Sequence, residues 1–205
     1  MPSRNIIKEY APDSYYHVYN RGVAKNLIFK NDTDYSVFLS LFKRHLSNEP
    51  HTSKYGHPHP HYKTQIELMV FCLMPNHFHL LVYQKEDSTA ITKLLQSVGT
   101  AYTMYFNRKY KRVGPLFQSR FKASRISSDE YLQHISRYIH LNPQNYRTYK
   151  WSSIAYYLNG HQAEWLNSIP ILDLFAGDNY LKFLEDYEGY KASLDEIKYE
   201  LANSL

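Results

Sequence analysis

Two apolar runs separated by only two residues constrain the fold more than any other feature of the sequence. The run TQIELMVFCLM ends at Met74, and the run HFHLLVYQ begins at His77. Pro75 and Asn76 lie between them, and these residue types interrupt extended chain and favour a turn. We therefore predict two adjacent strands joined by a tight turn, as in an antiparallel sheet.

The segments on either side of this pair predict further elements. Residues 14–22, SYYHVYNRG, are typical of a strand that is broken by a turn at its end. Apolar residues recur at helical spacing over residues 31–47, where Asn31 or Asp32 is the candidate cap, and again over about residues 90–107. Each of these two segments is predicted to be an amphipathic helix.

A third helix is predicted over residues 127–143. Ser127 followed by Glu130 indicates a capping box, and Pro143 would end the helix. Its core stripe is Leu132, Ile135 and Ile139. The order of strands and helices favours an α+β fold with an antiparallel sheet over a doubly wound parallel sheet.

The length of 205 residues fits one domain of ordinary size, or a domain of about 150 residues with an extension. We expect residues 1–158 to form the main domain and residues 159–205 a helical C-terminal extension. Residues 49–63, EPHTSKYGHPHPHYK, hold four histidines and three prolines, which predicts a mobile loop. Its histidines offer metal ligands, but a solvated insertion is the simpler interpretation.

Composition narrows the class of partner. Twenty-four Lys and Arg against nineteen Asp and Glu give a net charge of +5 and a pI near 9.0, which suggests a polyanionic partner. The single cysteine, Cys72, excludes an internal disulfide and a cysteine zinc site. No apolar run approaches the roughly twenty residues of a membrane span, and the N-terminus has no signal-peptide core. We therefore expect a cytoplasmic protein with no membrane partner.

A basic stretch from residue 108 to residue 125, RKYKRVGPLFQSRFKASR, contains no acidic residue. Basic side chains for phosphates next to aromatic rings for bases are what single-stranded nucleic acid requires, although a solvated basic loop would have a similar composition. The candidate DNA-binding residues are Arg108, Lys109, Lys111, Arg112, Phe117, Arg120, Lys122 and Arg125.

The histidine pair of the second apolar run suggests a metal site. Side chains alternate along a strand, so His77 and His79 point to the same face. A half-buried strand that happens to carry histidines is the alternative. On the third predicted helix Tyr138 and Asn142 share a face, so an amide oxygen could join the two imidazoles around a divalent ion, Mg²⁺ or Mn²⁺.

Such an ion would suit attack on a phosphodiester, and Tyr138 is the candidate nucleophile. A phosphotyrosine diester keeps the bond energy, so another DNA end can rejoin to it, whereas a hydrolase would use water. Tyr131 and His134 lie on the same helix face; Tyr131 is a candidate second nucleophile and His134 a candidate for proton transfer. Packing or surface roles are the alternatives for both.

Several segments together resemble a known family. MPNHFHLLV resembles the histidine-hydrophobe-histidine signature of the HUH endonucleases, and RYIHLNP resembles the nucleophile helix of the single-tyrosine transposases. YYHVYNRG, GPLFQSRF and WSSIAYYL are similar to segments of the REP-associated tyrosine transposases. The resemblance runs from about residue 15 to residue 158 and leaves out residues 51–62 and the tail after about residue 160.

This resemblance implies a ferredoxin-like antiparallel sheet with helices on one face. It also implies a metal-dependent endonuclease and strand transferase that nicks single-stranded or hairpin DNA through a 5′-phosphotyrosine intermediate and leaves a free 3′-hydroxyl. Carried over by position, His77 and His79 are metal ligands, Tyr138 is the nucleophile, and Asn142 takes the place of a third, amide-bearing ligand.

Two other functions remain open from the sequence. One is a domesticated relative that binds DNA hairpins without catalysis, and the other is a zinc- or copper-dependent hydrolase that uses His17 with His77 and His79. His17 is accordingly a reserve metal ligand. A homodimer is among the partners that the sequence leaves open.

Overall fold

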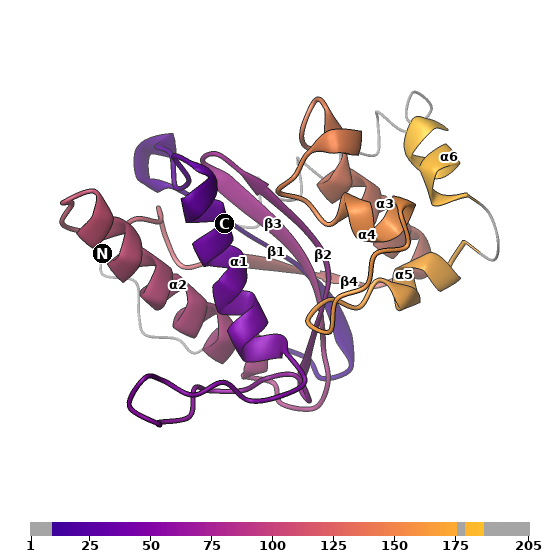
Figure 1. Cartoon of the computed structure of the whole chain (residues 1–205). Coiled ribbons are helices and arrows are strands. Elements are labelled where there is room, and N and C mark those ends of the chain that lie inside the picture. The colour runs from indigo at the N-terminus through magenta and orange to yellow at the C-terminus, as the bar shows by residue number, and fades with distance from the viewer. Residues whose placement is uncertain (1–9, 176–178, 187–205) are drawn as a thin grey trace.

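The computed structural model describes residues 10–175 and 179–186, and its centre is a four-stranded antiparallel sheet (Figure 1). The strands are β1 (Ser14–Arg21), β2 (Ile66–Met74), β3 (His77–Gln84) and β4 (Lys122–Ile126), in the order β2-β3-β1-β4. The predicted pair of strands on either side of Pro75 and Asn76 is therefore confirmed as β2 and β3.

One face of the sheet is covered by α1 (Asp32–Leu46) and α2 (Ala90–Lys109). Val18, Phe78 and Leu80 of the sheet pack into the same buried cluster as Phe38 of α1 and Tyr102 of α2. These five side chains are at most 4% exposed. The two helices were predicted from their periodicity, and their apolar stripes are the ones that meet the sheet.

The other face of the sheet is covered by α3 (Asp129–His140), and three shorter helices, α4 (Ile154–Leu158), α5 (Ile169–Asp173) and α6 (Tyr180–Glu185), lie on the same side of the sheet as α3. Single turns of 3₁₀ helix occur at Val23–Lys25 and Tyr146–Thr148. The predicted stripe of α3 is fully buried against strand residues of this face. The cluster includes Val70, Cys72, Leu81, Leu132, Ile135 and Ile139.

The α+β class with an antiparallel sheet is thus confirmed, whereas the expectation of helices on one face only is wrong. The physical reason is visible in the strands. On β2, Phe71 and Leu73 point to one face and Val70 and Cys72 to the other, and all four are apolar, so both faces must be covered. Here α1 and α2 cover one face, and α3 covers the other.

Two local predictions need correction. The cap of α3 is Ser128, whose Oγ accepts a hydrogen bond from the Tyr131 backbone N–H at 3.2 Å, so the predicted Ser127–Glu130 capping box is not used. The helix ends at His140 instead of reaching Pro143. By contrast, Asn31 caps α1 as predicted, accepting from the Asp34 N–H.

The predicted basic loop is not a loop throughout. Arg108 and Lys109 belong to the last turn of α2, and residues 122–126 form β4, which pairs with β1. Only the chain between them is irregular. Strand β4 was missed because KASRI has a single large apolar residue, so its sequence gives no alternating pattern.

The His/Pro segment at residues 49–63 folds back on itself. Thr52 and Pro58 form an isolated antiparallel bridge, His45 Nδ1 lies 2.6 Å from the Pro60 carbonyl oxygen, and His61 Nε2 lies 2.7 Å from that of Ser47. His61 of the segment and His45 of α1 are therefore both used in contacts to the backbone.

Helix α4 ends at Leu158, where the sequence analysis ends the main domain, and that division of the chain stays a prediction. Beyond it, α5 and α6 are helical, and Trp165, Ile171 and Leu184 are buried in the clusters on the two faces of the sheet. Residues 187–205 lie outside the described residues, so the rest of the predicted helical extension stays a prediction. In the described ranges, no helix has the length and apolar character needed to cross a membrane.

A buried carboxylate joins the two helices of the first face. Asp34 of α1 is fully buried and accepts hydrogen bonds from Lys109 Nζ at 2.6 Å, Tyr105 Oη at 2.9 Å, Tyr110 Oη at 2.8 Å and the Lys30 N–H at 2.8 Å. Burial would raise the pKa of the Asp34 carboxyl, but these donors together lower it below its usual value. The carboxylate therefore fixes the end of α2 against the start of α1.

Asp34→Ala should destabilise the fold by about 3 kcal/mol, because four donors lose their acceptor and Lys109 loses its counter-charge. Urea denaturation measures this. The lowered pKa means that the wild type gains from Asp34 above about pH 4 and loses that gain as the pH falls through the folded-state pKa, so the difference should shrink in acid.

Asp32→Ala is the matched control, since Asp32 lies in the same helical turn and its partner Lys150 is a surface residue. An exposed ion pair contributes little, so this variant should unfold almost like the wild type. Equal effects of the two substitutions would contradict the assignment of Asp34.

Candidate active site

The histidine pair of β3 lies at the start of the strand, on the face covered by α3. His77 is half-buried and His79 is 5% exposed, and their ring centroids are 5.1 Å apart. Both rings thus lie close together on one side of the sheet, as the alternation along a strand predicts.

The tyrosine and the amide predicted from the sequence meet this pair from α3 and the residues just after it. The Tyr138 ring centroid lies 5.3 Å from that of His79, with the rings nearly perpendicular. Asn142 Nδ2 donates to the Tyr138 carbonyl oxygen at 3.0 Å, and Asn142 Oδ1 lies 3.4 Å from His77 Nε2. The structure therefore brings together all four residues that the sequence singled out.

His17 of β1 contacts the His79 ring of this pair. It is fully buried, its Nε2 lies 2.9 Å from His79 Nδ1, and the two rings are stacked with centroids 5.1 Å apart. The Nε2 atom of His17 is engaged with His79, so His17 orients that ring and is not placed as a separate ligand. This contact disfavours a hydrolase in which His17, His77 and His79 hold an ion together.

A similar contact orients His77. Its Nδ1 lies 2.6 Å from the Asn76 side-chain oxygen, which can only accept, so His77 carries its proton on Nδ1. The Nε2 atom then has a free lone pair and faces Asn142 Oδ1. A hydrogen bond that holds one ring nitrogen while the other faces the site is the usual arrangement of a metal-binding histidine.

Burial keeps these imidazoles neutral. It lowers the pKa of His77, an effect that the contact with Asn142 opposes, and it lowers the pKa of His79 well below the usual value, with the charges of His17, His77 and Arg21 adding to the effect. The pKa of His17 falls to about 3 for the same reason of burial. Neutral imidazoles are the form that binds metal ions.

A divalent ion fits this donor set. The described residues contain no cluster of three His, Cys, Asp or Glu side chains that would hold a metal. The site instead offers two imidazoles and the Asn142 amide oxygen, with His77 Nε2 and Asn142 Oδ1 facing each other. Three donors with open positions would leave room for a substrate oxygen.

A pocket of about 370 Å³ lies beside these residues. Among the described residues that line it are two cations, Arg21 and Lys122, and no carboxylate. The pocket is therefore suited to an anionic group such as a phosphate. The lining residues are Tyr19, Asn20, Arg21, His77, Phe78, His79, Gln118, Ser119, Lys122 and Tyr138.

Arg21 is a candidate site residue that the sequence did not reveal. It lies directly opposite His77 in the pairing of β1 with β3, and its backbone oxygen accepts a hydrogen bond from the Gln118 N–H at 2.9 Å. The sequence signal for Arg21 was its place in the NRG turn at the end of the first predicted strand. The sequence does not show which strand pairs with this one, so the position of Arg21 opposite His77 could not be predicted.

The eight predicted DNA-binding residues fall into two groups. Lys122 lines the pocket beside Tyr138, while Phe117 and Arg120 line a second cavity described below; Arg125 is exposed on the same strand as Lys122. These positions agree with a role near the site. The predicted DNA contacts themselves stay a prediction.

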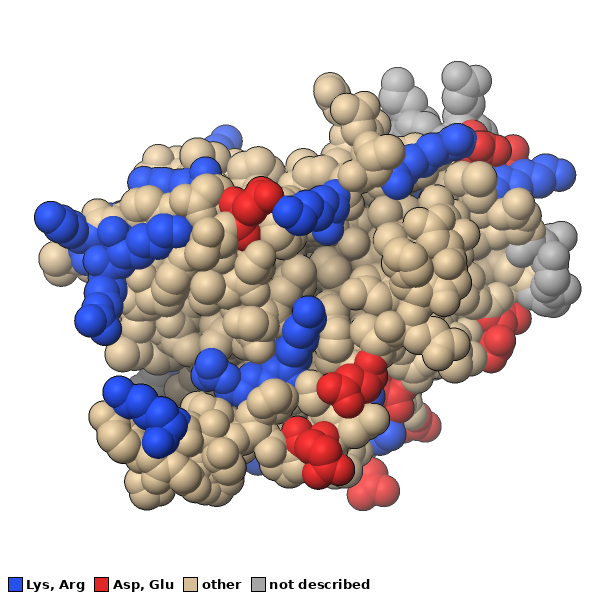
Figure 2. All heavy atoms as spheres, in the orientation of Figure 1, with Lys and Arg blue, Asp and Glu red and all other residues tan. Residues whose placement is uncertain are grey.

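The other four residues gather where α2 ends, and Figure 2 shows Lys and Arg side chains concentrated at that end of the molecule. Lys109 is paired with Asp34, and Arg112 donates to the Asn107 side chain at 3.0 Å and lies over the Phe106 ring. These two side chains are used to hold α2 in place. Arg108 and Lys111 are exposed.

Polar side chains of α3 also contact residues that come later in the chain. His140 is fully buried, with Nδ1 2.7 Å from Tyr180 Oη and Nε2 2.8 Å from Ser153 Oγ. His134 Nδ1 lies 2.9 Å from an Arg137 nitrogen, and Arg137 lies over the Phe183 ring. His134 therefore takes part in contacts toward α6, which disfavours the proton-transfer role considered from the sequence.

A histidine pair on a strand, facing a tyrosine on a helix beside a cationic pocket, defines a site suited to phosphodiester chemistry. Residues 57–142 match the family model described as "Transposase IS200 like". That range includes His77, His79, Tyr138 and Asn142 and excludes β1 with His17. Over these residues the chain is thus similar to the IS200-like transposases, which supports a transposase-type function in DNA processing.

The fold agrees with this match. The chain is similar to a solved structure described as "Structure of the REP associates tyrosine transposase bound to a REP hairpin", with a TM-score of 0.55 and 12% identity over 77% of this chain and 87% of that one. At this identity the likeness shows a shared fold. None of the curated proteins matches the chain. The resemblance to the single-tyrosine transposases is therefore confirmed.

Tyr180→Phe should destabilise the protein by about 1–3 kcal/mol, because the lost hydroxyl leaves His140 Nδ1 and Ser136 Oγ buried without this partner. Chemical denaturation measures the loss. Tyr55→Phe is the control, since Tyr55 is 75% exposed and should tolerate the change. Equal stability of Tyr180→Phe and wild type would show that α6 does not hold α3 through this hydroxyl.

Proposed function

We propose that this chain is a divalent-metal-dependent endonuclease and strand transferase of single-stranded DNA, with Tyr138 as its nucleophile. The observation that carries the proposal is the position of the Tyr138 ring against His79, beside a pocket lined by Arg21 and Lys122. A structural tyrosine would not need this cationic pocket. The match to the IS200-like transposases supports the same assignment.

In the proposed reaction the Tyr138 oxygen attacks a DNA phosphorus atom. A bond forms between these atoms, and the bond from phosphorus to the 3′ oxygen of the preceding nucleotide breaks. The phenol loses its proton and the departing 3′ oxygen gains one. The products are a 5′-phosphotyrosine and a free 3′-hydroxyl, and attack by another 3′-hydroxyl reverses the step and joins a new strand.

Mg²⁺ or Mn²⁺ bound by His77, His79 and Asn142 would polarise a non-bridging phosphate oxygen and lower the barrier to attack. Other residues of the chain orient these proposed ligands. Asn76 holds His77 with Nε2 toward Asn142, and His17 holds the ring of His79. Arg21 and Lys122 attract the phosphate, and the contact of Asn142 with the Tyr138 carbonyl fixes the end of the nucleophile helix.

The substrate we propose is a single strand next to a DNA hairpin. The solved relative of similar fold is bound to a REP hairpin, and the cationic lining described here suits a phosphate backbone. A non-catalytic hairpin-binding protein is the remaining alternative. It would keep DNA binding but would have no use for the Tyr138 hydroxyl.

Tyr138→Phe should abolish formation of a covalent protein–DNA adduct while leaving DNA affinity within about twofold, because it removes only the attacking oxygen and keeps the ring. The measurement uses a labelled hairpin with a single-stranded extension, Mn²⁺ and denaturing gel electrophoresis. Absence of any adduct with the wild type would favour the non-catalytic alternative.

Tyr131→Phe is the matched control for this experiment. Tyr131 lies on the same helix, is also half-buried and was the competing candidate from the sequence. It should form the adduct at nearly the wild-type rate. Adduct formation by Tyr138→Phe together with its loss in Tyr131→Phe would reverse the assignment of the nucleophile.

His77→Ala and His79→Ala should each weaken Mn²⁺ binding by at least about tenfold and abolish cleavage, because each removes a proposed ligand. Calorimetric titration with Mn²⁺ in the absence of DNA measures the affinity directly. His61→Ala is a suitable control, since His61 contacts the Ser47 carbonyl and lies outside the pocket. Wild-type Mn²⁺ affinity in both β3 variants would return the pair to an ordinary structural role.

A further inference from the structure

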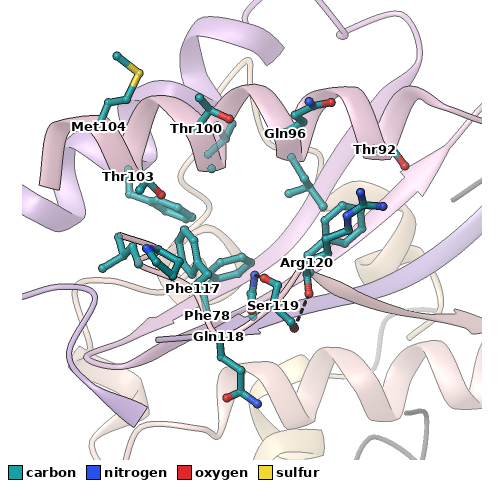
Figure 3. Close-up of a pocket in the computed structure, with 18 residues that line it drawn as sticks. Phe78, Thr92, Gln96, Thr100, Thr103, Met104, Phe117, Gln118, Ser119 and Arg120 are labelled. Atoms are coloured by element: carbon teal, nitrogen blue, oxygen red, sulfur yellow. Dashed lines mark hydrogen bonds between the residues drawn. The ribbon is translucent and has the colours of Figure 1, made fainter. Parts of the chain in front are cut away.

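A second and larger cavity lies on the other face of the sheet, between α2 and residues 115–121 (Figure 3). Its volume is about 930 Å³. Clefts that bury small organic ligands usually measure about 300–1,000 Å³, so this cavity has room for a nucleotide. The function proposed above makes no use of it.

The floor and one side of the cavity are apolar and aromatic. Phe78 and Phe117 meet edge to face, with centroids 6.0 Å apart, and Phe117 and Phe121 are each half-exposed. Partly exposed phenyl rings offer surfaces on which a flat ring can stack. The apolar residues of the lining are Phe38, Phe78, Leu95, Val98, Met104, Pro115, Leu116, Phe117 and Phe121.

The opposite side of the cavity is polar. Thr92, Gln96, Thr100 and Thr103 follow one another along a single face of α2, across from Phe117 and Arg120 (Figure 3). The Gln96 side chain is exposed and forms no hydrogen bond within the described residues. Its amide can both donate and accept, as recognition of the edge of a base requires.

The charge of the lining favours an anionic ligand. Among the described residues that line the cavity, Arg120 is the one charged side chain, and none carries a carboxylate. A nucleotide carries a negative phosphate next to its flat base, so both parts find matching groups here.

The open space next to Gly99 of α2 is a separate observation that agrees with a ligand contacting the helix backbone there. It lies inside the helix and lines the cavity, and a Cβ added to it would meet nothing within 4 Å. Packing therefore does not require glycine, although glycine inside a helix costs stability relative to alanine. Close approach of a ligand to the helix backbone is a reason to keep this position without a side chain.

The cavity adjoins the pocket of about 370 Å³ that lies beside Tyr138. Asn20, Phe78, Gln118 and Ser119 line both. In Figure 3, Gln118 points away from α2, on the opposite side of its segment from the cavity. A single strand could therefore place a phosphate in one pocket and a neighbouring base in the other.

The wall between the two pockets is fixed to β1. Asn20 Nδ2 donates to the Ser119 carbonyl oxygen at 3.1 Å, the Gln118 N–H donates to the Arg21 oxygen at 2.9 Å, and Gly22 and Phe117 form an isolated bridge. The cavity is thus preformed, and a base entering it would not have to order the wall first.

We propose that this cavity binds an unpaired base of the DNA strand whose phosphate occupies the catalytic pocket, and that it selects the position of the cut. The proposal rests on the function proposed above for its substrate. Phe117 and Phe121 stack on the base, the polar face of α2 contacts the edge of the base, and Arg120 contacts a neighbouring phosphate.

The test compares two fluorescent DNA hairpins by anisotropy, one with a short unpaired extension and one with abasic sites throughout that extension. The protein is Tyr138→Phe without added metal, so that no chemistry occurs. Tighter binding of the intact extension by about tenfold is expected, since stacking on an aromatic ring contributes roughly 1–3 kcal/mol per base. Equal affinity for the two hairpins, or no binding of either, would overturn the proposal.

Gly99→Leu and Gly99→Ala, made in the same background, form the matched pair. Leucine fills space that is open in the cavity and should reduce the preference for the intact extension to less than about twofold. Alanine leaves most of the space and should keep the preference, while raising the melting temperature by about 2–4 °C through its helix propensity. Full retention of the preference for the intact extension by Gly99→Leu would show that the base binds outside this cavity.

These results separate the two proposals. Adduct formation by the wild type together with equal affinity for the two hairpins would leave the nuclease assignment intact and remove the base pocket. A clear preference for the intact extension without any adduct from the wild type would leave the base pocket intact and remove the nuclease assignment.

Discussion

The antiparallel pairing of β1 with β3 is the interaction on which the candidate site depends. Its register sets Tyr19 opposite His79 and Arg21 opposite His77, so that His17 lies diagonally next to His79 on the same face. A shift of one residue would turn His17 to the face covered by α2 and carry Val18 away from the core. Because both faces of these strands are buried, such a shift is strongly opposed, and the packing of the sheet fixes the positions of the imidazoles.

The features that depend on neighbouring residues were predictable from the sequence. The alternation along HFHLLVYQ placed His77 and His79 on one face, and the helical spacing of four placed Asn142 one turn after Tyr138. The buried stripe of α3 and the Asn31 cap followed from equally local patterns. That the strand and the helix would meet came from the resemblance between segments, since no local pattern encodes that contact.

The features that sequence reasoning missed depend on contacts between distant residues. A uniformly basic run suggested one DNA-binding loop, but Lys109 is neutralised by Asp34, 75 residues earlier, and Lys122 is part of a strand beside the candidate site. His17 was considered as a ligand because its partner was unknown, and the pairing of β1 with β3 makes it a support for His79. Charge and residue type were correct in each case, and the partner decided the role.

Two polar side chains of α3, the helix that carries Tyr138, contact residues that come much later in the chain. His140 contacts Tyr180, which is 40 residues further on, and Arg137 donates to the Phe183 carbonyl oxygen. During synthesis on the ribosome, the residues proposed for catalysis therefore emerge before the helix that holds them in position. A growing chain would possess the proposed nucleophile but not a fixed geometry for it, so the proposed cutting of DNA could begin only when translation has passed α6.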